Sequence, residues 1–316
     1  MIWDVRMDLT MKNVSKTGFR QNIVQFRHYY IIIFPAILFF LLFSYYPMYG
    51  LVIAFKKFRA VDGLLGSEWI GLENFAKLFR NPGFYDAFQN TIIISLLRLA
   101  FAFPAPIILA LLFNEIRSRK YLRTIQTITC LPNFMSWVVL GGIFLQLLAP
   151  KSGAINQIIV LLGGEAIPFM THEGWFVFVL IITGIWQSVG WGSIIYMATI
   201  SGIDTEMYEA AVIEGAGRFK QMRYITLPFL APIISIQLIM ASSGVLNAGF
   251  DQIFNMYNTS VYNVADILDT YVYRIGIQGL DYSLSTAVGL FKNVIGFFIL
   301  VIVNFIAKKL GGTGIW

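Results

Sequence analysis

The residues with the most chemical potential lie in one polar segment, Glu209–Pro232, which interrupts an otherwise apolar chain. Its centre, Glu214-Gly-Ala-Gly-Arg218, is rich in glycine, as phosphate-binding loops are. The spacing differs from the Gly-x-x-x-x-Gly-Lys-Ser/Thr pattern of those loops, which the chain nowhere contains, and no strand pattern precedes it. We therefore interpret these glycines as turn residues and expect no cofactor on this chain.

Other catalytic patterns are also missing from the sequence. Cys130 is the single cysteine, so an intrachain disulfide is excluded. His28 and His172 lie far apart and no His-Glu-x-x-His motif occurs, so we expect no metal site. A membrane enzyme would need acids, bases or metal ligands that converge near one membrane face, and the sequence offers no such set.

Two basic residues, Arg98 and Lys292, stand inside long apolar runs, whereas no Asp or Glu falls squarely inside one. Carriers driven by protons or sodium usually need acidic groups near the midplane of the membrane, so their absence argues against a secondary carrier. Each cation can face a water-filled pathway, extend toward the membrane surface or pair with a partner subunit. The sequence leaves these alternatives open.

The composition is that of an integral membrane protein. The 316 residues are 57% hydrophobic and only 13% charged, whereas soluble domains are about a quarter charged. So few charges cannot cover a water-facing surface, and lipid must be the solvent for much of the chain. The formal net charge of +6 is modest. No basic tract alternates with aromatic residues, so we expect no nucleic-acid partner.

Several apolar runs have the length of about 20 residues that a membrane-spanning helix needs. We place six spans, all helical because an open strand would leave its backbone groups unpaired in lipid. The expected spans are residues 30–54, 88–113, 125–149, 175–199, 229–250 and 284–307. Residues 153–163 are apolar but too short to span, and we expect an interfacial helix on the outer side there.

Lys and Arg concentrate in the segments that flank one side of these spans, and such segments are usually cytoplasmic. The basic residues of this side are Arg6, Lys12, Lys16, Arg20, Arg27, Arg117, Arg119, Lys120, Arg123, Arg218, Lys220, Arg223, Lys308 and Lys309. We therefore expect an all-α integral membrane protein with both termini in the cytoplasm. Its tails are 1–28 and 311–316, its membrane domain is 29–310, and its loop 200–228 is cytoplasmic.

The first half of the loop has the signals of a short helix from about Thr205 to Glu214. Asp204 is a favourable N-cap, and the acidic residues Glu206 and Glu209 in the first turns suit the positive end of the helix dipole. Glu206, Glu209 and Ile213 have the spacing of one helical face. Ala210 and Ala211 add little bulk, so another protein can approach closely there.

The second half of the loop is expected to return the chain to the membrane. Gly215 can adopt the left-handed conformation that ends a helix. A second short helix is expected over 218–224, and Pro228 suits the first turn of the fifth span. Helices this short are not stable alone, so another protein is expected to hold this helix–turn–helix.

The pattern Glu209-Ala-Ala, then Gly215, then Ile225-x-Leu227-Pro228 resembles the cytoplasmic coupling loop in permease subunits of bacterial type I ABC importers. Asn90-Thr-Ile-Ile-Ile-Ser95, Leu109-Ala-Leu-Leu-Phe-Asn-Glu-Ile116, Leu131-Pro-Asn-Phe-Met-Ser-Trp137 and Asp269-Thr-Tyr-Val-Tyr-Arg274 are similar to the carbohydrate-uptake branch and its polysaccharide-type group. The resemblance covers residues 25–316. Glu214, Gly217 and Phe219 depart from it, standing where Asp, Ser and Trp are usual.

The resemblance implies a non-catalytic subunit in a multi-pass complex of the bacterial cell membrane. The expected partners are a cytoplasmic ATPase dimer that binds ATP and magnesium, a second six-span permease and an extracellular solute-binding protein. Glu209 would anchor the ATPase, Ala210 and Ala211 would form the close contact, and Gly215 would make the turn. The full set of expected coupling residues is Asp204, Glu206, Glu209, Ala210, Ala211, Ile213, Glu214, Gly215, Ala216 and Arg218.

Residues that suit sugar binding lie in two places in the spans. Sugars pack on aromatic faces and hydrogen-bond to amides and hydroxyls. The candidates are Trp186, Gln187 and Trp191 in the fourth span, and Asn247, Phe250 and Gln252 where the fifth span is expected to end. Trp is also a routine anchor at membrane interfaces, so this alternative stays open.

The leading hypothesis is a permease subunit for the import of oligosaccharides or polysaccharide fragments. The alternative is a channel or secondary carrier that acts alone on a small polar solute. Uptake through such a carrier would not depend on ATP or on Glu209. Neither the sugar nor the identity of the second permease follows from the sequence.

Overall fold

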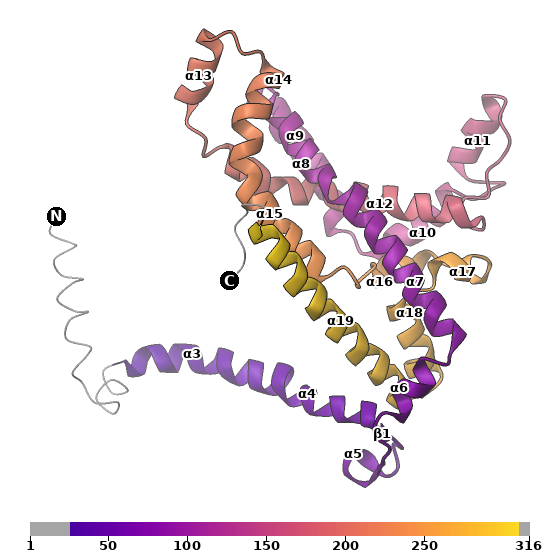
Figure 1. The fold of residues 1–316 in the computed structure, drawn as a ribbon. Helices are drawn as coiled ribbons and strands as arrows, with labels where there is room; N and C mark the ends of the chain where they lie inside the picture. The colour runs from indigo at the N-terminus through magenta and orange to yellow at the C-terminus, as the bar shows by residue number, and fades with distance from the viewer. Residues whose placement is uncertain (1–25, 310–316) are drawn as a thin grey trace.

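The computed structural model describes residues 26–309 as an assembly of long helices joined by short ones (Figure 1). The expected tails 1–28 and 311–316 lie almost wholly outside this range. The α-helices are α3 (Arg27–Phe40), α4 (Tyr46–Met48), α5 (Gly63–Gly66), α6 (Glu73–Leu78), α7 (Pro82–Leu97), α8 (Pro104–Asn114), α9 (Arg119–Cys130), α10 (Trp137–Leu147), α11 (Ala154–Leu161), α12 (Glu173–Ile200), α13 (Thr205–Ile213), α14 (Arg218–Gln221), α15 (Leu227–Ser243), α16 (Phe250–Met256), α17 (Tyr262–Ala265), α18 (Leu268–Tyr273) and α19 (Tyr282–Lys309).

Shorter elements connect or continue these helices. The π turns are η2 (Leu41–Tyr45), η4 (Arg98–Ala102), η6 (Met222–Thr226) and η8 (Arg274–Gln278), and the 3-10 turns are η3 (Tyr49–Phe55), η5 (Leu131–Phe134) and η7 (Thr259–Val261). Within residues 26–309, strand structure is limited to β1 (Lys56–Lys57), which pairs antiparallel with β2 (Glu68–Trp69).

The expected membrane spans are confirmed with changed boundaries. Five continuous helical stretches in residues 26–309 are long and apolar enough to cross a membrane. They are Arg27–Phe55, Pro82–Asn114, Glu173–Ile200, Arg218–Ser243 and Tyr282–Lys309. The remaining expected span is a helix pair, Arg119–Phe134 and Trp137–Leu147, bent by 101°. The spans number six when this pair is counted as one, so the fold class is confirmed.

The third span, expected over 125–149, is a bent pair of helices in the structure. Pro132 cannot continue the hydrogen-bond ladder of α9, and Met135 takes an extended conformation before Ser136 caps α10. Helix α12 also packs directly on this break: a side chain at Gly190 would collide with the carbonyl of Thr129. A proline and a close helix contact together redirect the chain.

Three of the π turns end two residues before a proline, at Pro47, Pro104 and Pro228. Proline has no N–H to donate and its ring clashes with the carbonyl four residues earlier, so the preceding turn must widen. At Pro104, the N–H of Phe103 reaches back to the carbonyl of Arg98 at 3.1 Å. The prolines inside the spans therefore widen the helices without breaking them.

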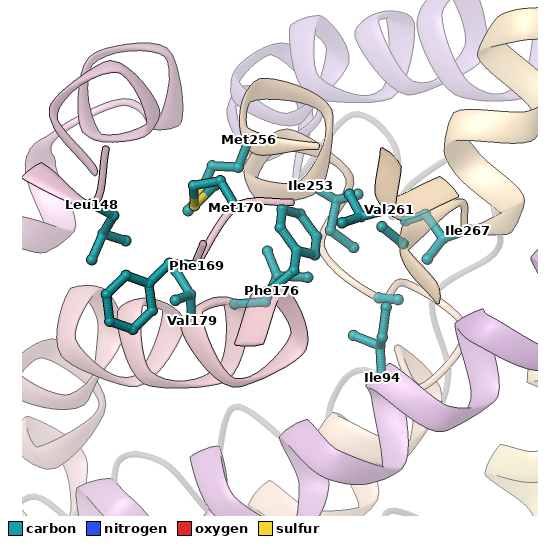
Figure 2. Packing of buried hydrophobic residues seen from close by; sticks show 13 residues of the cluster. Ile94, Leu148, Phe169, Met170, Phe176, Val179, Ile253, Met256, Val261 and Ile267 are labelled. Atoms are coloured by element: carbon teal, nitrogen blue, oxygen red, sulfur yellow. The ribbon is translucent and has the colours of Figure 1, made fainter. Parts of the chain in front are cut away.

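The main hydrophobic core joins the second and fourth spans to the segment that follows the fifth (Figure 2). Ile94 of α7, Phe176 of α12 and Ile253 of α16 are fully buried there, with Val261 and Ile267 from the following turns. Helix α3 differs, because it has no buried residue and lies apart from the other spans (Figure 1). The core therefore organises one end of the bundle, and the first span meets the other spans through η3, where Ala54 is buried, and not through α3.

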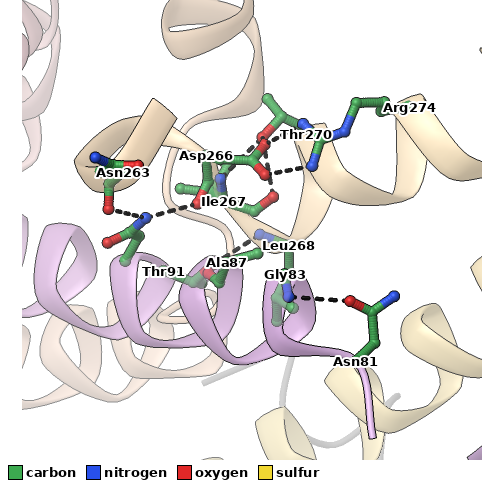
Figure 3. Close-up of polar contacts among 11 residues, drawn as sticks. Asn81, Gly83, Ala87, Thr91, Asn263, Asp266, Ile267, Leu268, Thr270 and Arg274 are labelled. Carbon is green, nitrogen blue, oxygen red and sulfur yellow. Dashed lines mark hydrogen bonds and ion pairs between the residues drawn. The ribbon is translucent and has the colours of Figure 1, made fainter. Parts of the chain in front are cut away.

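A buried polar network stands beside this core, toward the Pro82 end of the second span (Figure 3). Asp266, 7% exposed, accepts from Arg274 at 2.9 and 2.6 Å and from Thr270 at 2.8 Å. The hydroxyl of Thr91 accepts the N–H of Leu268 at 2.8 Å. The Thr91–Leu268 bond attaches this segment to α7, and the bonds of Asp266 hold the segment together internally.

Candidate functional site

Helix α13 has the ends that its sequence predicts. The carboxylate of Asp204 accepts the N–H of Glu206 at 3.0 Å, and the helix runs over Thr205–Ile213. Gly215 has a φ of +77° and donates to the carbonyl of Val212, while Ala216 donates to that of Ala211 at 2.8 Å. This pair of bonds is the Schellman motif, which favours glycine because a side chain is strained at positive φ.

Within residues 26–309, none of the residues of helix α13 is fully buried. Ile213 is 87% exposed and Val212 is 61% exposed, although both are apolar. Glu206 and Glu209 are exposed on the same short helix. An exposed mixture of apolar and acidic side chains, carried beyond the spans, is a surface suited to a protein partner.

Three polar contacts attach α13 and its turn to the spans. The hydroxyls of Tyr208 and Thr226 lie 2.9 Å apart, and the amide of Gln221 donates to the carbonyl of Ala216 at 2.8 Å. Arg218 pairs with Glu115, just past the end of α8, at 2.8 Å. These residues surround a pocket of about 440 Å³ beneath the turn. The Tyr208–Thr226 contact joins α13 to the fifth span, and the Arg218–Glu115 pair joins the start of the fifth span to the end of the second.

The second half of the loop corrects one expectation. Residues 218–224 do not form a separate short helix: α14 continues through η6 into α15, so the fifth span begins at Arg218 and ends at Ser243. The wide turn before Pro228 keeps the helix continuous. Tyr208, Thr226 and Glu115 were not among the expected site residues, because their partners lie 18 or more positions away.

The expected sugar-binding residues of the fourth span lie on α12. Trp186 and Trp191 are about half exposed, and each meets a neighbouring ring edge-on, Phe144 at 5.7 Å and Phe134 at 5.6 Å. Gln187, which lies between the two tryptophans in the sequence, is half-buried. Both indoles keep an open side, so their proposed contact with sugar stays a prediction.

The three candidates near the fifth span have different environments. Gln252 is 1% exposed, and its amide donates to the carbonyl of Leu180 at 2.9 Å and to the hydroxyl of Thr183 at 2.8 Å. It is therefore engaged within the chain. Phe250 stacks on Phe254 at 5.1 Å. Asn247 is exposed and lines two pockets between the spans.

The two cations inside the apolar runs have different environments. Lys292 pairs with Asp269 at 2.5 Å, so its charge is balanced inside the chain. Arg98 donates to the side-chain oxygen of Gln252 at 2.5 Å, which is a neutral acceptor. Among residues 26–309, no carboxylate pairs with Arg98. The structure thus separates two residues that the sequence presents as equivalent.

Apolar spans, pockets between them that contain polar side chains, and a capped helix exposed beyond them define an integral membrane protein of the transport class. The family described as binding-protein-dependent transport system inner membrane component matches residues 102–312, about two thirds of the chain. The chain therefore belongs to this family, and it is the membrane-spanning permease subunit of an ABC importer.

Curated relatives match almost the whole chain. The polygalacturonan/rhamnogalacturonan transport system permease protein YteP of Bacillus subtilis (strain 168) is 42% identical over 295 residues, covering 93% of this chain and 92% of the relative. Protein LplB of the same organism is 44% identical over 287 residues, covering 91% and 90%. The expected family is confirmed by these similarities.

Solved structures match the fold closely. The crystal structure of a bacterial ABC transporter involved in the import of the acidic polysaccharide alginate has a chain with a TM-score of 0.86 and 36% identity, covering 92% of this chain and 98% of that one. A second structure shows a bacterial alginate ABC transporter in complex with an alginate pentasaccharide-bound periplasmic protein, with a TM-score of 0.87 and 35% identity, covering 94% and 99%.

Proposed function

We propose that this chain is one of two permease subunits that import an oligosaccharide, and that its α13 docks in an ATPase. The observation that carries the proposal is the state of α13, which is capped at both ends and buries no residue of its own. A nine-residue helix is marginal alone, so it needs a partner to hold it. The sugar class is supported by the names of YteP and the alginate transporter.

The proposed complex contains a second permease, a dimer of cytoplasmic ATPases that bind ATP and magnesium, and an extracellular binding protein. The complex of the alginate transporter with its periplasmic protein supports the last of these. The first span, apolar and without a buried residue in α3, offers surface to lipid and to the second permease. This chain would contribute no catalytic group and would lie in the bacterial plasma membrane with α13 and both termini in the cytoplasm.

The contacts of α13 suggest how a push from the ATPase reaches the spans. Its C-terminal turn leads directly into α14, which is continuous with α15. Tyr208 and Arg218 add two lateral attachments, to Thr226 and Glu115. Because α13 is joined to the fifth span, and the fifth span to the second through Arg218 and Glu115, α13 and the inner ends of those spans would move together when the ATPases close.

The experiment is ATP-driven uptake by the complete transporter in proteoliposomes. Glu209→Lys places a positive charge where the partner is expected to receive an acid, and we expect uptake and substrate-stimulated ATP hydrolysis to be lost while the variant still assembles in the membrane. Glu165→Lys, a charge reversal at another exposed position, is the matched control and should transport normally. Normal uptake by Glu209→Lys, or uptake independent of ATP, would favour a carrier that acts alone.

A further inference from the structure

A pocket of about 270 Å³ lies between the second and fifth spans, beside Arg98. Its walls come from η4 and its neighbours on one side and from the last turn of α15 and the following loop on the other. Arg98 stands at the midpoint of the span Pro82–Asn114. The volume is near the lower limit of small-molecule pockets, which begin at about 300 Å³, so it suits one end of a ligand.

Two buried polar groups beside this pocket have no hydrogen-bond partner among residues 26–309. The hydroxyl of Ser95 is buried without a hydrogen bond, and so is the Nε of Arg98. Ser95 is 5% exposed and lies three residues before Arg98, on the same face of the helix. Asn247 brings an amide from the opposite wall. Buried donors without acceptors are uncommon in native proteins, and a ligand is one way to satisfy them.

The charge of Arg98 is also unbalanced. An arginine near the centre of a membrane costs about 2.5–3.5 kcal/mol even on the lower scales, and such residues usually mark a pathway or a site. Lys292 shows how this chain balances a cation when it does so internally, through Asp269. No acidic residue lines the pocket of Arg98. The pocket therefore favours an anion.

The backbone around Arg98 is shaped to leave it room. Gly249 has a φ of +90°, and the guanidinium occupies the place where a side chain of residue 249 would begin. Ala102, Ala241 and Gly244 contribute small side chains, or none, to the pocket wall.

From these observations we infer that Arg98, Ser95 and Asn247 form a subsite for the carboxylate of an acidic sugar residue, an inference that rests on the proposed function. The guanidinium can bind the two carboxylate oxygens through its free N–H groups. The serine hydroxyl and the asparagine amide can bind the carboxylate edge or a neighbouring sugar hydroxyl. The substrate class of this permease is thereby narrowed to oligosaccharides that contain uronic acid.

The test compares two substrates of nearly the same shape in the complete transporter, reconstituted in proteoliposomes with its ATPase and binding protein. The probes are trigalacturonate and its methyl ester, which lacks the negative charges. We expect Arg98→Gln to reduce uptake of the acid about 10- to 100-fold, the loss expected for one charge-assisted hydrogen bond, and to leave uptake of the ester within about twofold. Arg98→Lys should retain part of the acid uptake.

Two further variants separate recognition from structure. Ser95→Ala should lower uptake of the acid about fivefold, because it removes one neutral donor. As in Arg98→Gln, uptake of the acid should fall more than uptake of the ester. Lys292→Gln is the matched control: it removes the other intramembrane cation but leaves the pocket donors, so it should affect acid and ester equally.

Equal loss of both substrates in Arg98→Gln would overturn the inference and assign Arg98 to the structural contact with Gln252. A wild-type complex that imports neutral oligosaccharides and rejects trigalacturonate would also overturn it, while the proposed function would stand. If the complete complex imports no oligosaccharide with ATP, the proposed function itself fails.

Discussion

The network around Asp266 and the helix α13 lie at opposite ends of the second span, and they are stabilised in opposite ways. Asp266 is buried and hydrogen-bonded to Thr270 and Arg274 of its own chain. Helix α13 has no fully buried residue in the part of the chain that the structure describes, and it exposes Ile213 at its end. The charges of the first region are paired within this subunit, whereas the second lacks contacts that another protein would have to provide.

The electrostatics of the Asp266 region agree with this difference. The hydrogen bond with the Asp266 carboxylate raises the pKa of Arg274 above its ordinary value, because the pairing favours the charged guanidinium. The Arg274 guanidinium also lies 5.5 Å from the centre of the Tyr262 ring. Polar groups at this end of the bundle serve the fold. At the other end, the acids of α13 remain free for a partner.

Asp266→Ala should have the largest effect on stability. It leaves Arg274 partly buried without its carboxylate, and breaking such a pair costs about 3–5 kcal/mol. We expect a clear loss of thermal stability and of assembled protein, measured by size-exclusion chromatography of heated samples. Asp62→Ala, which breaks the exposed pair with Arg59 at 3.5 Å, is the control and should change little. Equal stabilities would contradict the idea that this end is self-sufficient.

Gly215→Val should have a smaller effect on stability and a large one on transport. A β-branched residue at a φ of +77° is strained by roughly 1–2 kcal/mol, which reorients the turn after α13. We expect ATP-driven uptake to fall strongly while the variant remains assembled. Gly217→Val is the matched control, because Gly217 has a φ of −67° and open space around it. Similar loss in both variants would mean that the turn geometry is not the cause.

Tyr208→Phe should weaken the attachment of α13 to the fifth span. It removes the hydrogen bond with Thr226, worth about 1 kcal/mol, and leaves the ring in place. We expect fewer substrate molecules to be imported per ATP hydrolysed, since the ATPase contact persists while its connection to the spans loosens. Tyr224→Phe, at an exposed ring, should keep the wild-type ratio. An unchanged ratio in Tyr208→Phe would show that this bond does not transmit movement.

Glu115→Gln should have the smallest effect. The pair with Arg218 is about half exposed, and such pairs contribute about 0.2–1 kcal/mol. A double-mutant cycle with Arg218→Gln measures the coupling energy through uptake rates, and we expect it to decrease as salt is added. A coupling energy as large as the Asp266 effect would remove the distinction between the two regions.

The sequence predicted local features well. The limits of α13 agree with the structure to within one residue, because a cap, a dipole and a glycine act over one helical turn. The helical class and the number of spans followed from long apolar runs. Features that depend on packing between distant parts of the chain could not be predicted from such local signals. The bend in the third span depends partly on α12 packing at Gly190, and the start of the fifth span depends on a π turn before Pro228.

The sequence by itself determined that this chain spans a membrane, carries no phosphate-binding loop and presents a capped helix between two spans. These properties follow from composition and from residues close together in the chain. Only the tertiary structure decided that Lys292 is balanced by Asp269, that Gln252 is engaged within the chain, and that Arg98 faces a pocket without a counter-charge. The reason is physical: the environment of a buried charge is set by whichever elements pack against it, and those elements are distant in sequence.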